Sequence, residues 1–229
     1  MPVNTQLMFS ILKGWTSQFL FKGMLAGGHI RLDDDPRLKW HIDTVGGVQK
    51  KKVLELGSLE AAHTKMLCEH GAFVTAIEGN PDCFLRCLIV KEAFDLKAKF
   101  IFGDFCEYVK DCGWFDIVSA TGVLYHQTNP VELIFDISKI TDTVFVWSQV
   151  ASETIPPGEE TKIDGYKGKI NRYGIPTSSF CGGLHDEAFW MYPDDMRRCF
   201  EDAGFNITEK PVLSNINGDC LLFVASKDI

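Results

Sequence analysis

Short apolar runs alternate with segments of helical periodicity through the middle of the chain. Each apolar run fits a buried strand, and glycine or an Asn-Pro pair stands where the intervening helices end or begin. The expected strands are 53–57, 72–77, 99–102, 115–119 and 143–149. Five buried strands separated by helices predict a parallel sheet with right-handed crossovers and helices on both faces.

The pattern changes near the end of the chain. Residues 193–203 predict a helix that stops at Gly204, and two strands, 205–213 and 219–226, follow with only a polar turn between them. Strands joined without a helix are antiparallel. The predicted fold is therefore α/β and Rossmann-like, a seven-stranded, mostly parallel sheet with a C-terminal antiparallel hairpin.

Two further segments lie outside the strand–helix alternation. Residues 4–25 place apolar side chains at helical spacing, which predicts an amphipathic helix over the core or over a site, and 37–48 predict a second helix. We interpret residues 1–52 as an N-terminal helical cap and 53–229 as the main domain. Within it, residues 151–192 form a long insertion without clear periodicity, which is typical of a lid or substrate-binding element.

The charge and the cysteine pattern indicate which partners and which cellular compartment to expect. The 229 residues are 45% apolar and carry a net charge of −8, and residues 1–52 alone hold eight basic and four acidic side chains. The acidic remainder argues against a general nucleic-acid binder. No apolar run approaches the ~18 residues of a membrane span, and no signal-peptide pattern is present. Because the eight cysteines form no C-x-x-C pair, we expect reduced, structural thiols in a cytoplasmic protein, rather than a disulfide framework or a zinc site.

Acidic residues stand at the ends of the first three predicted strands. Ligands of open α/β sheets bind beyond the carboxyl ends of the strands, where Glu55, Glu78 and Asp104 are expected. A carboxylate after the second strand can accept hydrogen bonds from two ribose hydroxyls, and Gly57 lets the backbone approach a ligand closely. The alternative for each acid is a local role, such as an N-cap for Asp104.

These motifs, in this order, resemble the class I S-adenosylmethionine-dependent methyltransferases over residues 53–148 and in the terminal hairpin. Glu55-x-Gly57 is similar to the family's first motif, Glu78 to its ribose acid, and Asp104-Phe105 to its adenine-contacting pair. The resemblance implies S-adenosyl-L-methionine as the cofactor. The cofactor-binding residues expected on this basis are Glu55, Gly57, Ser58, Glu78, Gly79, Asn80, Gly103, Asp104, Phe105 and Thr121.

The first motif departs from the family pattern at two positions. Its usual second and third glycines are replaced by Leu59 and Ala61. A dinucleotide-binding G-x-G-x-x-G loop starting at Gly57 would need glycines where Leu59 and Ala62 stand, which disfavours NAD. The missing glycines also permit a non-catalytic cofactor-binding or scaffold protein.

The segment after the fourth predicted strand carries candidate catalytic residues. Gly122-Val123-Leu124-Tyr125-His126, followed by Asn129-Pro130, is similar to a methyltransferase subgroup that includes tRNA wobble-uridine alkyltransferases and many small-molecule methyltransferases. Methyl transfer to a hydroxyl requires removal of a proton, and histidine is the usual base. His126, with Tyr125 beside it, is the candidate; alternatively, His126 only braces the loop.

Aromatic and basic residues of the insertion are candidates for the acceptor pocket, although packing and solvated charge explain them equally simply. The candidate substrate-binding residues are Tyr166, Arg172, Tyr173, His185 and Trp190. No acid follows the fifth predicted strand, so no metal site is expected.

The sequence thus predicts a methyltransferase that uses S-adenosyl-L-methionine. We expect transfer to an oxygen of a small or anionic metabolite, such as a sugar or a secondary-metabolite intermediate. The alternative enzyme is a tRNA-uridine modifying methyl- or alkyltransferase. The net negative charge of residues 53–229 argues against this alternative. The sequence leaves the acceptor and the oligomeric state open.

Overall fold

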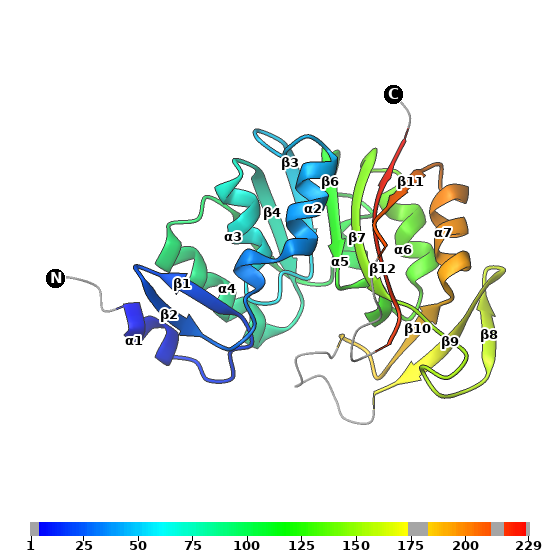
Figure 1. Cartoon of the computed structure of the whole chain (residues 1–229), viewed down its shortest axis with the longest axis horizontal. Helices are drawn as coiled ribbons and strands as arrows, with labels where there is room; N and C mark the ends of the chain where they lie inside the picture. Colours follow the sequence, from blue (N-terminus) through cyan, green and yellow to red (C-terminus); the bar gives the residue numbers. More distant parts are fainter. Residues whose placement is uncertain (1–4, 174–182, 212–217, 228–229) are drawn as a thin grey trace. The chain divides into compact units, whose positions relative to one another are not determined.

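The computed structural model describes residues 5–173, 183–211 and 218–227 of the chain (Figure 1). It divides into two compact units, Met1–Phe105 and Cys106–Ile229. Within the described residues, no helix is long and apolar enough to cross a membrane.

The first unit contributes three parallel strands to the sheet. They are β3 (Lys52–Leu56), β4 (Phe73–Glu78) and β5 (Lys99–Phe102), and β4 pairs with both others. The connecting helices are α3 (Ala62–Glu69) and α4 (Pro81–Phe94). The Asn80 side chain caps α4 by accepting the backbone N–H groups of Asp82 and Cys83, as the Asn-Pro pair predicts.

The prediction of one helix over residues 4–25 is wrong. This segment forms α1 (Thr5–Ser10) and an antiparallel hairpin of β1 (Gln18–Phe21) and β2 (Met24–Gly27). Lys22 and Gly23, between the strands, both have positive φ, the conformation of a two-residue hairpin turn. The 3₁₀ turn η1 (Leu32–Asp34) and the helix α2 (Pro36–Thr44) follow, the latter within the range predicted for the second helix.

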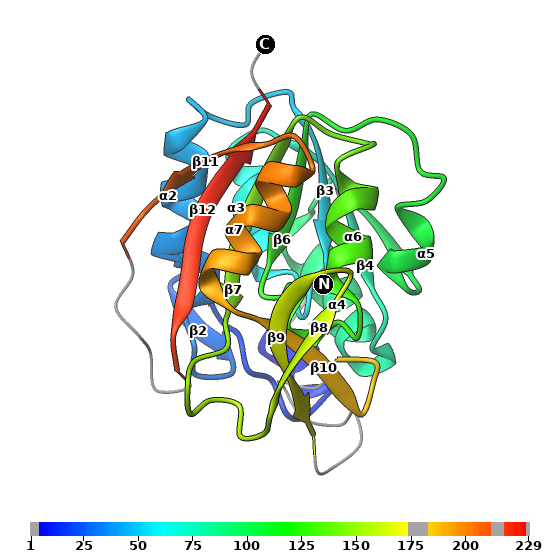
Figure 2. The same ribbon diagram turned by 90° about the vertical axis from the view of Figure 1, so that its right-hand side faces the viewer.

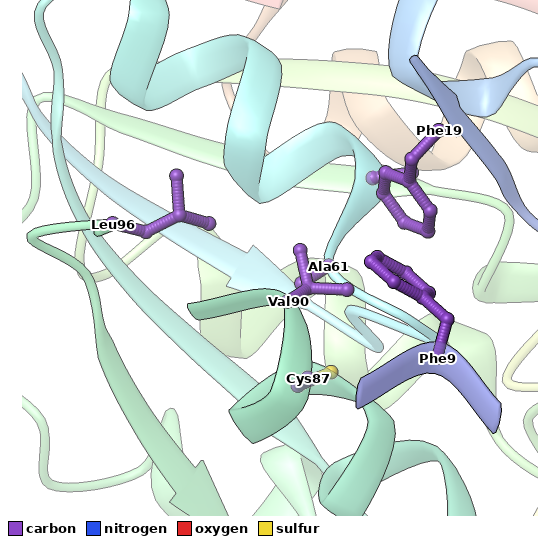
Figure 3. Packing of buried hydrophobic residues seen from close by; sticks show 7 residues of the cluster. Phe9, Phe19, Ala61, Cys87, Val90 and Leu96 are labelled. Carbon is purple, nitrogen blue, oxygen red and sulfur yellow. The ribbon is translucent and has the colours of Figure 1, made fainter. Parts of the chain in front are cut away.

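Buried aromatic side chains pack this N-terminal segment against the rest of the first unit. The cluster shown in Figure 3 includes Phe9, Phe19, Ala61, Cys87, Val90 and Leu96. The buried carboxylate of Glu60 accepts the backbone N–H groups of Thr16 and Ser17, at 3.1 and 2.6 Å. The loop after β3 therefore contacts the start of the hairpin through Glu60 and through Ala61.

The second unit contains the remaining strands of the sheet. Its parallel pair is β6 (Ile117–Thr121) and β7 (Thr143–Gln149). β12 (Cys220–Ser226) is antiparallel to β7 and to β11 (Asn206–Glu209). The helices are α5 (Phe105–Tyr108), which begins at the end of the first unit, α6 (Pro130–Ile137) and α7 (Pro193–Asp202).

The sheet has seven strands in the order β11-β12-β7-β6-β3-β4-β5. All neighbours assigned within each unit are parallel except those made by β12, which pairs antiparallel on both sides. The predicted fold class is confirmed: a Rossmann-like, mostly parallel sheet that ends in an antiparallel hairpin.

The insertion 151–192 has regular structure that its sequence does not predict. It forms a three-stranded antiparallel sheet of β8 (Glu160–Ile163), β9 (Tyr166–Arg172) and β10 (Glu187–Met191). Figure 2 shows this sheet beside α7, where the Tyr166 hydroxyl donates a hydrogen bond to Asp202 at 2.7 Å. Residues 174–182 of the insertion lie outside the described residues, and its role as a lid stays a prediction.

Candidate active site

The loop between β3 and α3 has a left-handed backbone at three alternate positions. Gly57, Leu59 and Ala61 have φ values of 65°, 53° and 62°. A residue with a Cβ atom costs about 1–2 kcal/mol in this conformation, so contacts must offset the cost at Leu59 and Ala61. The Leu59 N–H donates to Glu78 Oε2 at 2.7 Å, and the Ala61 methyl group is buried in the cluster of Figure 3. The loop therefore keeps a conformation that glycine favours, although Leu59 and Ala61 stand at two of the glycine positions.

Glu78 connects the ends of all three strands of the first unit. It is the last residue of β4, is 8% exposed, and accepts the N–H of Leu59 and that of Asn80, the latter at 2.8 Å. The backbone carbonyl of Glu78 accepts the N–H of Gly103, which follows β5. Burial raises the pKa of Glu78, while backbone hydrogen bonds, including one from Gly79, act in the opposite direction. This carboxylate holds the loops together and leaves part of its acceptor capacity for a ligand.

Glu55 is a second buried acid at this edge. It lies inside β3, is 3% exposed, and accepts a hydrogen bond from the Thr64 hydroxyl of α3. Burial raises the pKa of Glu55 to about 7. A carboxylate with a pKa this high is stabilised in its charged form by any cation that approaches it. The structure thus provides a protein partner for Glu55 and an environment suited to a cationic ligand group.

The other predicted cofactor residues of the first unit belong to the same three strand ends. Gly57 and Ser58 follow β3, Gly79 and Asn80 follow β4, and the segment Gly103–Phe105 follows β5. The Gly57 and Ser58 N–H groups donate to the Ile77 carbonyl, at 2.9 and 3.3 Å. The carboxyl ends of β3, β4 and β5 therefore bring these residues to one edge of the unit.

In the second unit, aromatic rings surround the 3₁₀ turn η2 (Leu124–His126) after β6. The Tyr125 ring packs edge-on against Trp147 of β7 and Trp190 of β10, each at a centroid distance of 5.8 Å. The His126 ring lies 4.2 Å from that of Tyr125 and 5.9 Å from that of Tyr173. We call Tyr125, His126, Trp147, Tyr173 and Trp190 the aromatic cluster. Trp147 is not among the predicted site residues, although it lies near the end of the parallel strand β7.

His126 is held at its Nδ1 side. The Tyr173 hydroxyl lies 3.3 Å from His126 Nδ1 and 3.0 Å from the carbonyl oxygen of Tyr125. Burial lowers the pKa of His126 to about 4, well below the ordinary value of 6.5. The imidazole is therefore neutral at physiological pH, with one nitrogen able to accept a proton.

The sequence matches no protein-family model and no curated protein. The structure, in contrast, is similar to solved structures. The N-terminal domain of EvdMO1, crystallised in the presence of SAH and D-fucose, is 24% identical, with a TM-score of 0.82 over 97% of this chain and 95% of that chain. The fold is that of the Rossmann-like methyltransferases. Magnesium protoporphyrin IX methyltransferase from Synechocystis PCC 6803 with bound SAM is more distant, with 15% identity and a TM-score of 0.58 over 83% of this chain and 76% of that chain.

The chain spans about half the length of the complete EvdMO1 structure. That comparison covers 97% of this chain and 46% of the other, with 21% identity and a TM-score of 0.71. The methyltransferase fold is thus shared with one domain of a longer protein.

The remaining predicted site residues lie at different places in the methyltransferase fold. Thr121 ends β6, with its hydroxyl 3.3 Å from that of Ser119. Tyr166 packs on α7, Arg172 pairs with Glu187 at 3.2 Å on the surface, and His185 is exposed. Of the five predicted substrate residues, the structure brings Tyr173 and Trp190 into the aromatic cluster.

Proposed function

We propose that this protein is an S-adenosyl-L-methionine-dependent methyltransferase that acts on a hydroxyl oxygen of a small molecule, with a sugar or related ring as the acceptor class. One observation carries the proposal: the buried Glu78 joins the ends of three parallel strands. Its carboxylate accepts the N–H groups of Leu59, in the left-handed loop after β3, and of Asn80, and its backbone carbonyl accepts the N–H of Gly103 after β5. Support comes from the fold, since solved structures with the same fold contain SAM or SAH.

The residues at this edge fit the chemical groups of such a cofactor. Glu78 would accept ribose hydroxyls, the buried Glu55 would pair with the ammonium group, and Asp104 would accept the adenine amino group. The backbone of Gly57 and Ser58 would approach the ligand, with Gly79, Asn80, Gly103, Phe105 and Thr121 as further contacts. When bound, S-adenosyl-L-methionine supplies an electrophilic methyl group on a positively charged sulfur.

The aromatic cluster is the proposed acceptor side. His126 would take the hydroxyl proton of the acceptor, because its imidazole is neutral at physiological pH and has one unprotonated nitrogen. The rings of Tyr125, Trp147 and Trp190 would exclude water and contact the apolar face of a ring-shaped acceptor. Tyr173 and Trp190 belong to the insertion, which supports its proposed role in covering the acceptor.

Trp190 offers a hydrogen-bond donor for the acceptor. Its indole N–H is buried and has no hydrogen-bond partner among the described residues. Buried donors of this kind are uncommon, because an unmade hydrogen bond costs about 1–3 kcal/mol. An acceptor oxygen would satisfy the Trp190 N–H.

We expect Trp190→Phe to raise the KM for the acceptor about three- to tenfold, the loss of one neutral hydrogen bond, and to change kcat little. Initial rates against acceptor concentration measure this effect. Trp114→Phe, at an exposed tryptophan, is the matched control and should leave KM unchanged. An unchanged KM in Trp190→Phe would show that the indole N–H does not contact the acceptor.

The proposed function is tested with methyl-labelled S-adenosyl-L-methionine and three acceptor pools: sugars and sugar nucleotides, phenols, and total tRNA. Label in the sugar pool is expected. Label in phenols alone would overturn the acceptor class, and label in tRNA alone would overturn the small-molecule proposal. Binding of S-adenosylhomocysteine without transfer to any pool would favour a non-catalytic protein.

A further inference from the structure

The hydroxyl of Tyr173 makes two contacts with η2 and has one proton for both. Its oxygen lies 3.0 Å from the Tyr125 carbonyl oxygen and 3.3 Å from His126 Nδ1. A carbonyl oxygen can only accept, so the hydroxyl proton of Tyr173 is donated to it. The hydroxyl oxygen then has lone pairs but no further proton to offer to His126.

This geometry fixes the direction of the second hydrogen bond. The contact between Tyr173 and His126 is a hydrogen bond only if Nδ1 carries a hydrogen and donates it to the hydroxyl oxygen. A neutral imidazole has one N–H, so Nε2 is then unprotonated. No hydrogen bond to His126 Nε2 is present among the described residues, whereas Nδ1 is engaged.

We infer that Tyr173 holds His126 in the tautomer with hydrogen on Nδ1 and thereby makes Nε2 the basic nitrogen. The inference deepens the proposed function, on which it rests, because it assigns the proton-accepting atom and the residue that sets it. Tyr173 is a positioning residue: it acts through His126 and touches the turn rather than the reacting atoms.

A second contact restrains the same turn. A Cβ atom added to Gly183 would lie 2.8 Å from the carbonyl oxygen of His126 and 2.9 Å from its Cβ atom. Only a residue without a side chain fits against this backbone unless the turn moves. Tyr173 and Gly183, both from the insertion, thus contact His126 at its ring and at its backbone.

The tautomer is consistent with a balanced transfer step. The proton of the acceptor hydroxyl passes to Nε2, the acceptor oxygen bonds the methyl carbon, and the electrons of the broken carbon–sulfur bond stay on sulfur. One positive charge leaves the sulfur and one appears on the imidazole, so the net charge of the site is unchanged. The Nδ1–H of the resulting imidazolium remains hydrogen-bonded to the Tyr173 oxygen, which stabilises that charge.

The tautomer can be read directly from ¹⁵N-histidine-labelled full-length protein, because protonated and unprotonated ring nitrogens give distinct signals in long-range ¹H–¹⁵N spectra. His126→Asn assigns the resonance among the six histidines. We expect hydrogen on Nδ1 in the wild type and a loss of this preference in Tyr173→Phe. Tyr166→Phe, which removes a different hydroxyl of the insertion, is the control and should leave the His126 tautomer unchanged.

Two results would overturn the inference: hydrogen on Nε2 in the wild type, or an unchanged tautomer in Tyr173→Phe with the other five histidine signals in place. Because this readout needs no acceptor, its failure is distinguishable from failure of the proposed function. In the kinetic assay, Tyr173→Phe should lower kcat on the order of tenfold if about one-tenth of the molecules keep the competent tautomer. Affinity for S-adenosylhomocysteine should not change.

Discussion

A His126→Asn variant should lose roughly 100- to 10,000-fold in methyl-transfer rate, the usual contribution of a general base, and keep its affinity for S-adenosylhomocysteine. The substitution retains a polar side chain of similar size but removes the basic nitrogen. His126 is the histidine in the aromatic cluster, and its partly buried ring lies against those of Tyr125 and Tyr173. Single-turnover transfer measures the chemical step without product release.

The pH profile provides an independent check on His126. Burial lowers its pKa from 6.5 to about 4, and the base works when unprotonated. The wild-type rate should therefore rise with pH through about 4 and be level near neutrality, whereas the rate of His126→Asn should lack this rise. Circular dichroism must accompany the acidic points, because protonation of a buried histidine also opposes folding.

His70→Asn is the matched control, since His70 is exposed at the end of α3 and bonds only the Met66 carbonyl among the described residues. Its rate should equal that of the wild type. A His126→Asn rate within about threefold of the wild-type rate, far from the loss expected for a base, would show that His126 only braces the turn. Tyr125 and His185 would then be the next candidates.

Glu78→Ala should weaken binding of S-adenosylhomocysteine by roughly 100-fold, about 3 kcal/mol, because ribose hydroxyls lose a charged acceptor. Titration calorimetry of the folded variant measures this change. The same carboxylate also accepts the N–H groups of Leu59 and Asn80. Loss of affinity alone therefore does not separate a ribose contact from damage to the loop after β3.

A deoxyribose analogue of S-adenosylhomocysteine makes the distinction. The wild type should bind the analogue more weakly than the parent ligand, and Glu78→Ala should bind both equally. Glu60→Gln is the control, because Glu60 is also buried but bonds the backbone of Thr16 and Ser17. It should lower thermal stability and still discriminate between the ligands. Discrimination in Glu78→Ala equal to that of the wild type would remove Glu78 as the ribose acceptor.

Most strands of the main sheet could be predicted because they are short apolar runs followed by glycine or Asn-Pro. The run 99–102 does form a strand, but β5 lies at the edge of the sheet and is partly exposed rather than buried. The N-terminal hairpin could not be predicted, since the apolar residues of 4–25 also fit a helical stripe. In the structure, Phe19 and Phe21 are buried and Leu20 between them is exposed, a period of two rather than 3.6. The hairpin requires a turn with positive φ at Lys22 and Gly23. A Lys-Gly pair is a weaker signal for such a turn than Asn-Gly.

The site residues that could be predicted from the sequence are those that follow the predicted strands. Polar side chains at the strand ends indicate Glu55, Glu78 and His126. No acid follows the fifth strand, and this rule therefore does not indicate Trp147. The role of Tyr173 was not predictable in detail, because it depends on a contact between residues 47 positions apart. The lowered pKa of His126 likewise results from burial by separate segments.

Titration calorimetry of the full chain with S-adenosylhomocysteine, and in parallel with NAD⁺, tests the central claim most directly. The claim is that the edge formed by the ends of β3, β4 and β5 binds the adenosyl cofactor. We expect one molecule of S-adenosylhomocysteine to bind per chain and NAD⁺ to give no binding heat. Absence of binding by S-adenosylhomocysteine to the folded protein, or its displacement by NAD⁺, would contradict the account.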